Sequence, residues 1–128
     1  DLLAGSAVGC RGRLHLALGD FNALAETDYA TPGALEQLRA YQEAQGWPVP
    51  AFDLIGRVLK SGYVDAFVAA GGAAAKGATW PAQAPERRID YIFLPRVVAD
   101  ALRNCAPLTD PLVAEASDHL PVLAEIDV

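Results

Sequence analysis

Three short polar segments carry the residues most able to do chemistry. They are Gly19-Asp20-Phe21-Asn22, Arg88-Ile89-Asp90-Tyr91 and Ser117-Asp118-His119. Each lies beside an apolar run, at a point where a strand meets a loop and a rigid scaffold usually presents functional groups. Hydrolysis of a phosphoester needs a base for the attacking water and donors for the charge that grows on the phosphoryl oxygens. The three segments therefore predict one site for phosphoryl chemistry, at which three strands converge.

Each segment also has a purely structural interpretation. Asp20 and Asn22 are common turn formers, because both side chains can bond their own backbone. A Ser-Asp-His triplet can simply cap a loop, and the lone His15 is expected to be structural or exposed. Asp90 is harder to explain in this way, because a carboxylate in an apolar strand needs a partner, and His119 can supply it. The joint occurrence of all three segments favours the functional interpretation.

The elements that would position these segments follow from periodicity. Alternating Leu14, Leu16 and Leu18 predict a strand with one buried face. Helices are expected from Thr31-Pro32 to residue 46 and over 52–59, and further strands over 89–94, 103–108 and 119–128. The segment 63–67 is expected to be a short strand or turn, and 97–102 a short helix or turn. The Gly- and Ala-rich segment 69–78 predicts a flexible loop with little to pack. Strands that alternate with helices indicate an α/β layer.

The polar segments, with their flanking residues, resemble a known family. Leu18-Gly19-Asp20-Phe21-Asn22-Ala23, the segment 88–93 and the segment 116–122 are similar to the last three motifs of the endonuclease/exonuclease/phosphatase superfamily, the DNase I-like metal-dependent phosphoesterases. Their order and wide spacing agree, and the segment 62–67 and Trp80-Pro81 also resemble bacterial members. The resemblance implies an α/β chain that forms the C-terminal half of a four-layer α/β/β/α sandwich. We then expect one mostly antiparallel sheet flanked by helices.

The resemblance also implies roles for four residues. Asp20 would orient and deprotonate the attacking water, and Asn22 would donate its amide to the nucleophile or to a phosphate oxygen. His119 would donate to the phosphate as charge builds. Asp90 would hold the other ring nitrogen of His119, which fixes the tautomer and favours the imidazolium.

Three further residues are candidates for binding metal or substrate, and the resemblance implies the role of the first. Asp118 is expected near Mg²⁺, or Mn²⁺, through a water molecule, because Mg²⁺ keeps several waters and uses few carboxylates. Arg88 is a candidate for substrate contact, with a surface salt bridge as the alternative. Trp80 is either a substrate-facing ring or, as we favour, a core residue.

Composition narrows the class of substrate. The chain has 128 residues, of which 52% are hydrophobic and 20% charged, which is typical of one globular domain. No apolar run is long enough to span a bilayer, and the sequence leaves the compartment open. The net charge is −6 and the basic residues are scattered, which favours small phosphoesters or lipid-derived phosphates over duplex DNA. Cys10 and Cys105 are expected to be free thiols, with a disulfide as the alternative.

The earlier motifs of the family, which include a metal-binding Glu, are not found in this chain, and the chain contains no Met. We therefore expect a fragment, whose intact parent hydrolyses phosphoesters. The main alternative is a catalytically inactive scaffold or interaction module. A serine hydrolase built on Ser117 and His119 is disfavoured, because no Gly-x-Ser-x-Gly occurs. A half-domain would expose an apolar sheet face to the N-terminal half or to a second copy, with the expected members Leu14, Leu16, Leu18, Tyr91 and Val122.

Overall fold

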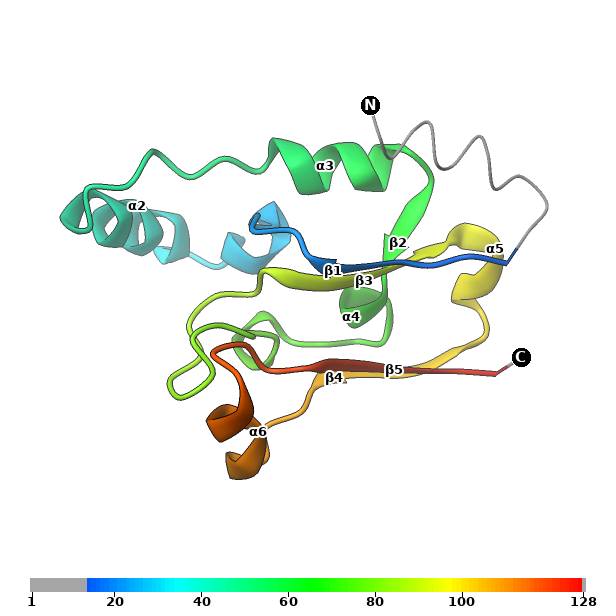
Figure 1. Ribbon diagram of the computed structural model, residues 1–128. Helices are drawn as coiled ribbons and strands as arrows, with labels where there is room; N and C mark the ends of the chain where they lie inside the picture. The colour runs from blue at the N-terminus through cyan, green and yellow to red at the C-terminus, as the bar shows by residue number, and fades with distance from the viewer. Residues whose placement is uncertain (1–13, 128) are drawn as a thin grey trace.

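The computed structural model describes residues 14–127, which form a small α/β protein with two antiparallel sheets (Figure 1). In the first sheet β3 (Asp90–Pro95) lies between β1 (Ala17–Asp20) and β2 (Tyr63–Asp65). The second sheet pairs β4 (Leu102–Pro107) with β5 (Val122–Ile126). The expected α/β class and antiparallel pairing are confirmed, but the expectation of a single sheet is wrong for the described residues. Strand β5 lies against β3 and cannot pair with it, because β1 and β2 already occupy both edges of β3.

The two longest helices are α2 (Ala34–Ala44) and α3 (Asp53–Lys60). The shorter α-helices are α4 (Ala66–Ala69), α5 (Arg96–Ala99) and α6 (Pro111–Ala116), and the 3-10 helices are η1 (Glu26–Tyr29) and η2 (Ala74–Lys76). Helix α2 begins later than expected, because Thr31-Pro32 form a turn in which the carbonyl of Thr31 accepts from the N–H of Ala34. Helix α6 was not expected. Its sequence signal is Asp110 followed by Pro111, since the Asp110 carboxylate caps the N–H of Leu112.

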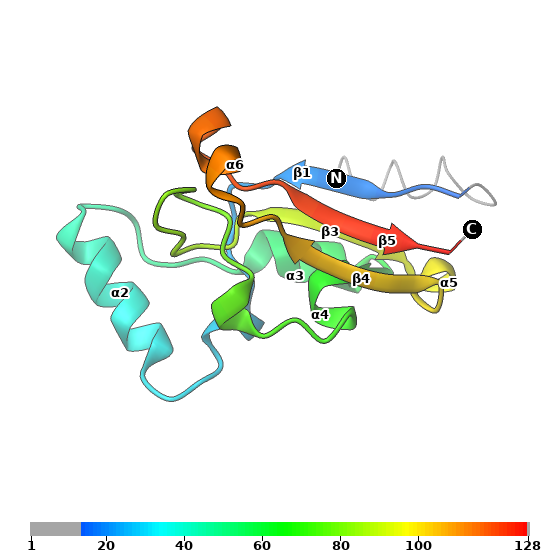
Figure 2. The ribbon, with the colours of Figure 1, turned by 90° about the horizontal axis from the view of Figure 1, so that it is seen from below.

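Strand β3 is the centre of the core and packs on both faces. Tyr91 and Phe93 face α3, where Ile55 and Val58 are buried against them. On the opposite face Ile92 and Leu94 pack with Phe67 and the inner side of the β4–β5 sheet. Successive strand side chains point to opposite faces, so β3 separates the two layers seen in Figures 1 and 2.

One face of β1 and the residues before it stays uncovered. Leu14, Leu16 and Leu18 are 68%, 42% and 63% exposed, which agrees with the expected apolar sheet face. Tyr91 was assigned to the same face and this is wrong, because it is 2% exposed and lies opposite Gly19, on the α3 side of the sheet. Val122 is half-buried against the second core layer.

Most of the Gly- and Ala-rich segment 69–78 is exposed, as expected of a loop with little to pack, but Gly72 and Gly77 lie close against the ring of Phe67. A Cβ atom on Gly72 would lie 2.4 Å from the ring of Phe67, and one on Gly77 would lie 2.5 Å from it. The buried ring therefore requires residues without side chains at both positions.

No helix within residues 14–127 has the length and apolar character needed to cross a bilayer.

Cys105 is a buried free thiol, and burial raises its pKa to about 11. Cys10 lies outside the described residues. His15 is half-buried and bonds the hydroxyl of Tyr63 at 3.1 Å, as expected for a structural imidazole.

Candidate active site

The end of β1 forms a tight turn that presents Asp20. Gly19 has a φ of 140°, and Asn22 has a φ of 47°, in the left-handed region that Asn tolerates better than most residues. The N–H of Asn22 donates to Oδ1 of Asp20 at 2.7 Å. The turn-forming interpretation is therefore correct for one carboxylate oxygen. The other oxygen, Oδ2, lies 3.9 Å from Nε2 of His119.

Asp90 and His119 form the hydrogen bond that the sequence predicted. Nδ1 of His119 lies 2.9 Å from Oδ2 of Asp90, at the start of β3. This bond raises the pKa of His119 above its ordinary value, against the opposing effect of burial, and the charges of Asp90, Asp20 and Asp118 raise it further. The imidazolium is thus favoured, with Nδ1 donating to Asp90 and Nε2 directed toward the Asp20 side.

Thr79 is a member of this cluster that the sequence did not reveal. Its side chain is fully buried, and Oγ1 donates to Oδ2 of Asp90 at 2.6 Å. Its carbonyl accepts from the N–H of Leu120 at 2.8 Å, directly after His119. Thr79 therefore connects the segment of Asp90 to the segment of His119. A lone Thr among apolar neighbours gives no signal of this role before the segments are brought together.

A cleft of about 660 Å³ opens beside these groups. Asp20, Asn22 and His119 line it together with Trp80 and Arg87, and Trp47, Pro48, Val49 and Ala51 continue its wall. Trp80 also packs against a buried cluster that contains Leu38 and Ile89. Trp80 thus packs against the core, as favoured, and also lines the cleft.

Asp118 and Arg88 do not line this cleft. Asp118 is exposed and lines a separate hollow with Pro81 and Ser117. It immediately precedes His119, and successive side chains of an extended segment point in opposite directions. Arg88 is 4% exposed and pairs with Asp28 and Asp65, which excludes a surface salt bridge and does not fit substrate contact. Its neighbour Arg87 lines the cleft instead.

The cluster of Asp20, Asp90 and His119 meets only part of what a Mg²⁺ site requires. Asp20, Asp90 and His119 each offer one ligand atom within 4.8 Å of the others. However, Oδ2 of Asp90 already accepts two hydrogen bonds, and Mg²⁺ prefers oxygen to imidazole nitrogen. Mg²⁺ is commonly held by one or two carboxylates and substrate phosphate oxygens. Oδ2 of Asp20 and the exposed carboxylate of Asp118 are the groups near the cleft that fit such a role.

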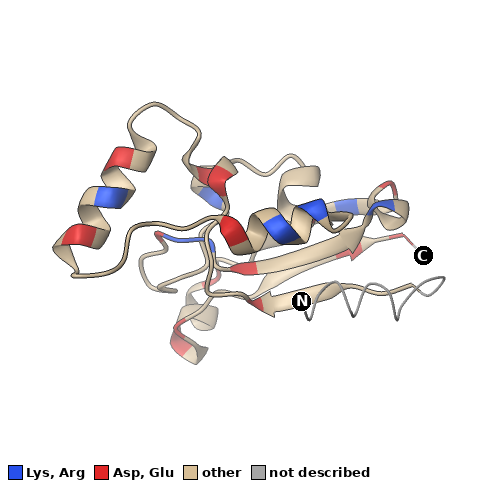
Figure 3. Ribbon diagram, turned by 90° about the horizontal axis from the view of Figure 1, so that it is seen from above, with Lys and Arg blue, Asp and Glu red and all other residues tan. Residues whose placement is uncertain are grey.

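Charge is spread over the surface of the described residues without a basic stripe. Figure 3 shows Lys and Arg on α2, on α3 and in the segment before β3, interspersed with Asp and Glu. This distribution suits a small substrate better than a long polyanion.

Comparison with known proteins adds no relative to this picture, since no family model matches the chain and no curated protein matches it either. The function is therefore argued from the geometry of the site.

Proposed function

We propose that this chain carries part of the active site of a metal-dependent phosphoester hydrolase. The observation that supports the proposal most strongly is the Asp90–His119 hydrogen bond of 2.9 Å beside Asp20. An imidazole held by one carboxylate and facing a second is an arrangement for acid–base chemistry. The three residues come from three separate segments, and the cleft beside them has room for a substrate.

The proposed reaction places the phosphoryl group in the cleft, within reach of both Asp20 and His119. Oδ2 of Asp20 accepts a proton from water, whose oxygen forms a new bond to phosphorus while the bond to the organic group breaks and its oxygen takes up a proton from solvent. Asn22 lines the same cleft and would donate its amide to the water or to a phosphate oxygen. Nε2–H of His119 donates to a phosphoryl oxygen as its charge grows, and Asp90 keeps the proton on Nδ1. Bound Mg²⁺ or Mn²⁺ would neutralise charge on the phosphoryl oxygens.

The uncovered β1 face supports a finer proposal about the fold. We propose that the described residues correspond to the C-terminal half of a DNase I-like sandwich, in which a second sheet packs on Leu14, Leu16 and Leu18. Their exposure is the supporting observation, since apolar patches on a sheet face normally contact a partner. The partner would be an N-terminal half or a second copy. The same face also supports the alternative function, a catalytically inactive interaction module.

Turnover of bis(4-nitrophenyl) phosphate in Mg²⁺ or Mn²⁺ tests the proposed chemistry. Asp20→Asn and His119→Ala should each lower turnover on the order of a hundredfold or more, the scale for a positioned acid or base. Asp100→Asn is a matched control, because Asp100 is an exposed acid after α5 that does not line the cleft. Metal-dependent turnover that survives both cleft substitutions would refute the roles. These variants are made in a parent protein that includes the expected N-terminal half, and a folded parent with no turnover in either metal would favour the interaction module.

A further inference from the structure

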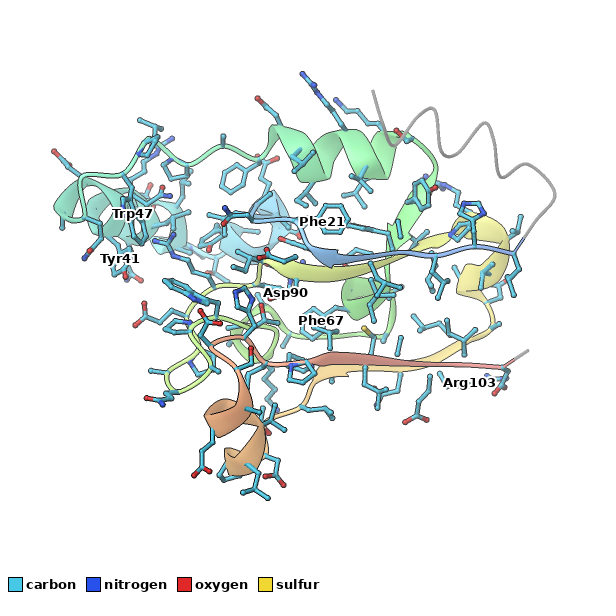
Figure 4. All side chains as sticks on the ribbon, in the orientation of Figure 1. Phe21, Tyr41, Trp47, Phe67, Asp90 and Arg103 are labelled. Atoms are coloured by element: carbon cyan, nitrogen blue, oxygen red, sulfur yellow. The ribbon has the colours of Figure 1, made fainter. Side chains whose placement is uncertain are left out.

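Arg87, which lines the cleft, lies against two aromatic rings, of which Trp47 also lines the cleft and Tyr41 does not. The guanidinium carbon of Arg87 lies 4.8 Å from the ring centre of Tyr41 and 4.6 Å from that of Trp47. Figure 4 shows Tyr41 and Trp47 together, at the α2 side of Asp90. Trp80 completes this group, because its backbone pairs with that of Arg87 in an isolated antiparallel bridge. These four side chains are called the aromatic wall below.

The backbone fixes the members of the aromatic wall relative to one another. The N–H groups of Thr79 and Trp80 both donate to the carbonyl of Arg87, at 2.8 and 3.0 Å. The N–H of Trp47 donates to the carbonyl of Gln42, at 2.8 Å, just before α2 ends. The wall is thus tied to the Thr79 segment, which also holds Asp90. A group bound to it would have a defined position relative to Asp20 and His119.

Two buried polar atoms at this wall lack hydrogen-bond partners within residues 14–127. They are Nη2 of Arg87, a donor, and Oε1 of Gln42, an acceptor. Gln42 is only 9% exposed, yet it lines the cleft. Leaving a buried donor or acceptor unpaired costs about 1–3 kcal/mol, so such atoms usually have a partner. A ligand edge that offers both an acceptor and a donor fits this pair.

The size and lining of the cleft indicate the shape of that ligand. A cleft of about 660 Å³ is in the size range of small-molecule sites and is far larger than a phosphoryl group. Trp47 and Val49 are 38% and 79% exposed, so large apolar side chains remain uncovered at the site. Indole rings bind flat aromatic groups by offset stacking or edge contact.

We propose that the aromatic wall binds the organic group of the phosphoester, and that this group is a planar aromatic ring with a polar edge. The inference rests on the proposed function for the phosphoryl end of the cleft. The ring packs against Trp47 and Trp80, and its edge pairs with Arg87 and Gln42. Nucleobases have this chemistry. A phenyl group has the planar ring without the polar edge, and aliphatic alcohols such as glycerol have neither.

Tryptophan fluorescence tests binding directly. The chain has two tryptophans and both line the cleft, so the intrinsic signal reports on this site alone. The folded chain is titrated without metal, so that no turnover is needed, with adenosine 5′-monophosphate, phenyl phosphate, glycerol 3-phosphate and inorganic phosphate. The aromatic esters should give saturable changes, with a Kd about tenfold or more below that of glycerol 3-phosphate. Adenosine 5′-monophosphate should bind more tightly than phenyl phosphate, whose ring has no polar edge, and equal binding of the two would refute the pairing with Arg87 and Gln42.

Matched arginine substitutions test the role of the wall. Arg87→Gln should weaken binding of adenosine 5′-monophosphate about tenfold or more, since it removes the stacked cation and its donors. Arg57→Gln, which removes an exposed charge on α3 away from the cleft, should change the Kd less than about twofold. Circular dichroism checks that both variants are folded. Arg87→Lys keeps the charge and, if Arg87→Gln does not fold, provides the same test, because Lys cannot present the planar fork.

The proposal is overturned if glycerol 3-phosphate binds as tightly as the aromatic esters, if no ester gives a saturable signal, or if the folded Arg87 variant binds normally. Its failure is distinguishable from failure of the proposed function. Metal-dependent turnover without preference for aromatic esters would leave the hydrolase proposal in place and refute this one. Binding of aromatic esters without metal-dependent turnover would leave this proposal in place and refute the hydrolase proposal.

Discussion

Replacement of Arg88 by methionine should strongly destabilise the protein, because its guanidinium is buried between two carboxylates. Nη1 lies 2.7 Å from Oδ2 of Asp65, and Nε and Nη2 lie 2.9 and 3.1 Å from the oxygens of Asp28. The guanidinium carbon also lies 4.6 Å from the ring centre of Tyr91 and 5.1 Å from that of Phe67. The ion pairs therefore tie η1 and β2 to the start of β3. Methionine fills much of the space but pairs with neither acid.

The expected size follows from the two acids left behind. Removing one partner of a buried ion pair typically costs about 3–5 kcal/mol, a large part of the roughly 5–15 kcal/mol that stabilises a domain. Burial already raises the pKa of Asp28 while Arg88 is present, although the pairing with Arg88 opposes this. Without Arg88 that carboxyl takes up a proton more readily. The loss should therefore be largest near neutral pH and smaller in acid, where Asp28 is neutral.

Urea unfolding measures this loss. With a slope near 1.5 kcal/mol per molar, a loss of about 3 kcal/mol lowers the midpoint by roughly 2 M. Arg103→Met is the matched control, because Arg103 pairs with Asp127 and both side chains are 62% exposed. It should cost at most about 1 kcal/mol. Adding Asp28→Asn to Arg88→Met should recover part of the loss. If Arg88→Met and Arg103→Met lower the free energy of unfolding equally, the loss comes from breaking an ion pair of any kind. That result would refute the role of the unpaired buried charge.

Three further predictions concern the site and its support. Thr79→Val should lower phosphodiester turnover about tenfold while Thr79→Ser retains most of it, because only the hydroxyl bonds Asp90. Since the folded-state pKa of His119 is raised, the Asp90–His119 pair should contribute stability that is complete below about pH 6.5 and lost as the pH rises through that folded-state pKa. NMR titration should show the raised value in the wild type and a lower one in Asp90→Asn, and identical titration curves would contradict the assignment. Gly77→Ala should cost about 1–3 kcal/mol in thermal unfolding, because its Cβ would lie 2.5 Å from the ring of Phe67. An unchanged melting temperature would show that the ring can move.

The sequence by itself determined the elements whose signals are local. The apolar run at β3, the strand expected over 103–108 at β4 and the helical spacing at α3 agree with the observed elements within a few residues of their bounds. It also determined the Asp90–His119 contact. That prediction rests on two points. An unpaired carboxylate such as Asp90 in an apolar strand is costly, and the next polar segment along the chain supplies His119 as a partner.

Only the tertiary structure decided which side chains share the cleft. Two adjacent arginines are alike in sequence, yet Arg88 is enclosed by Asp28 and Asp65 while Arg87 lies on the aromatic wall. Likewise, Tyr91 is assigned to the α3 face by the register of β1 against β3. The physical reason is that a one-residue shift in register moves every side chain of a strand to the other face. Register depends on pairing between segments far apart in the chain, and local sequence patterns do not contain that information.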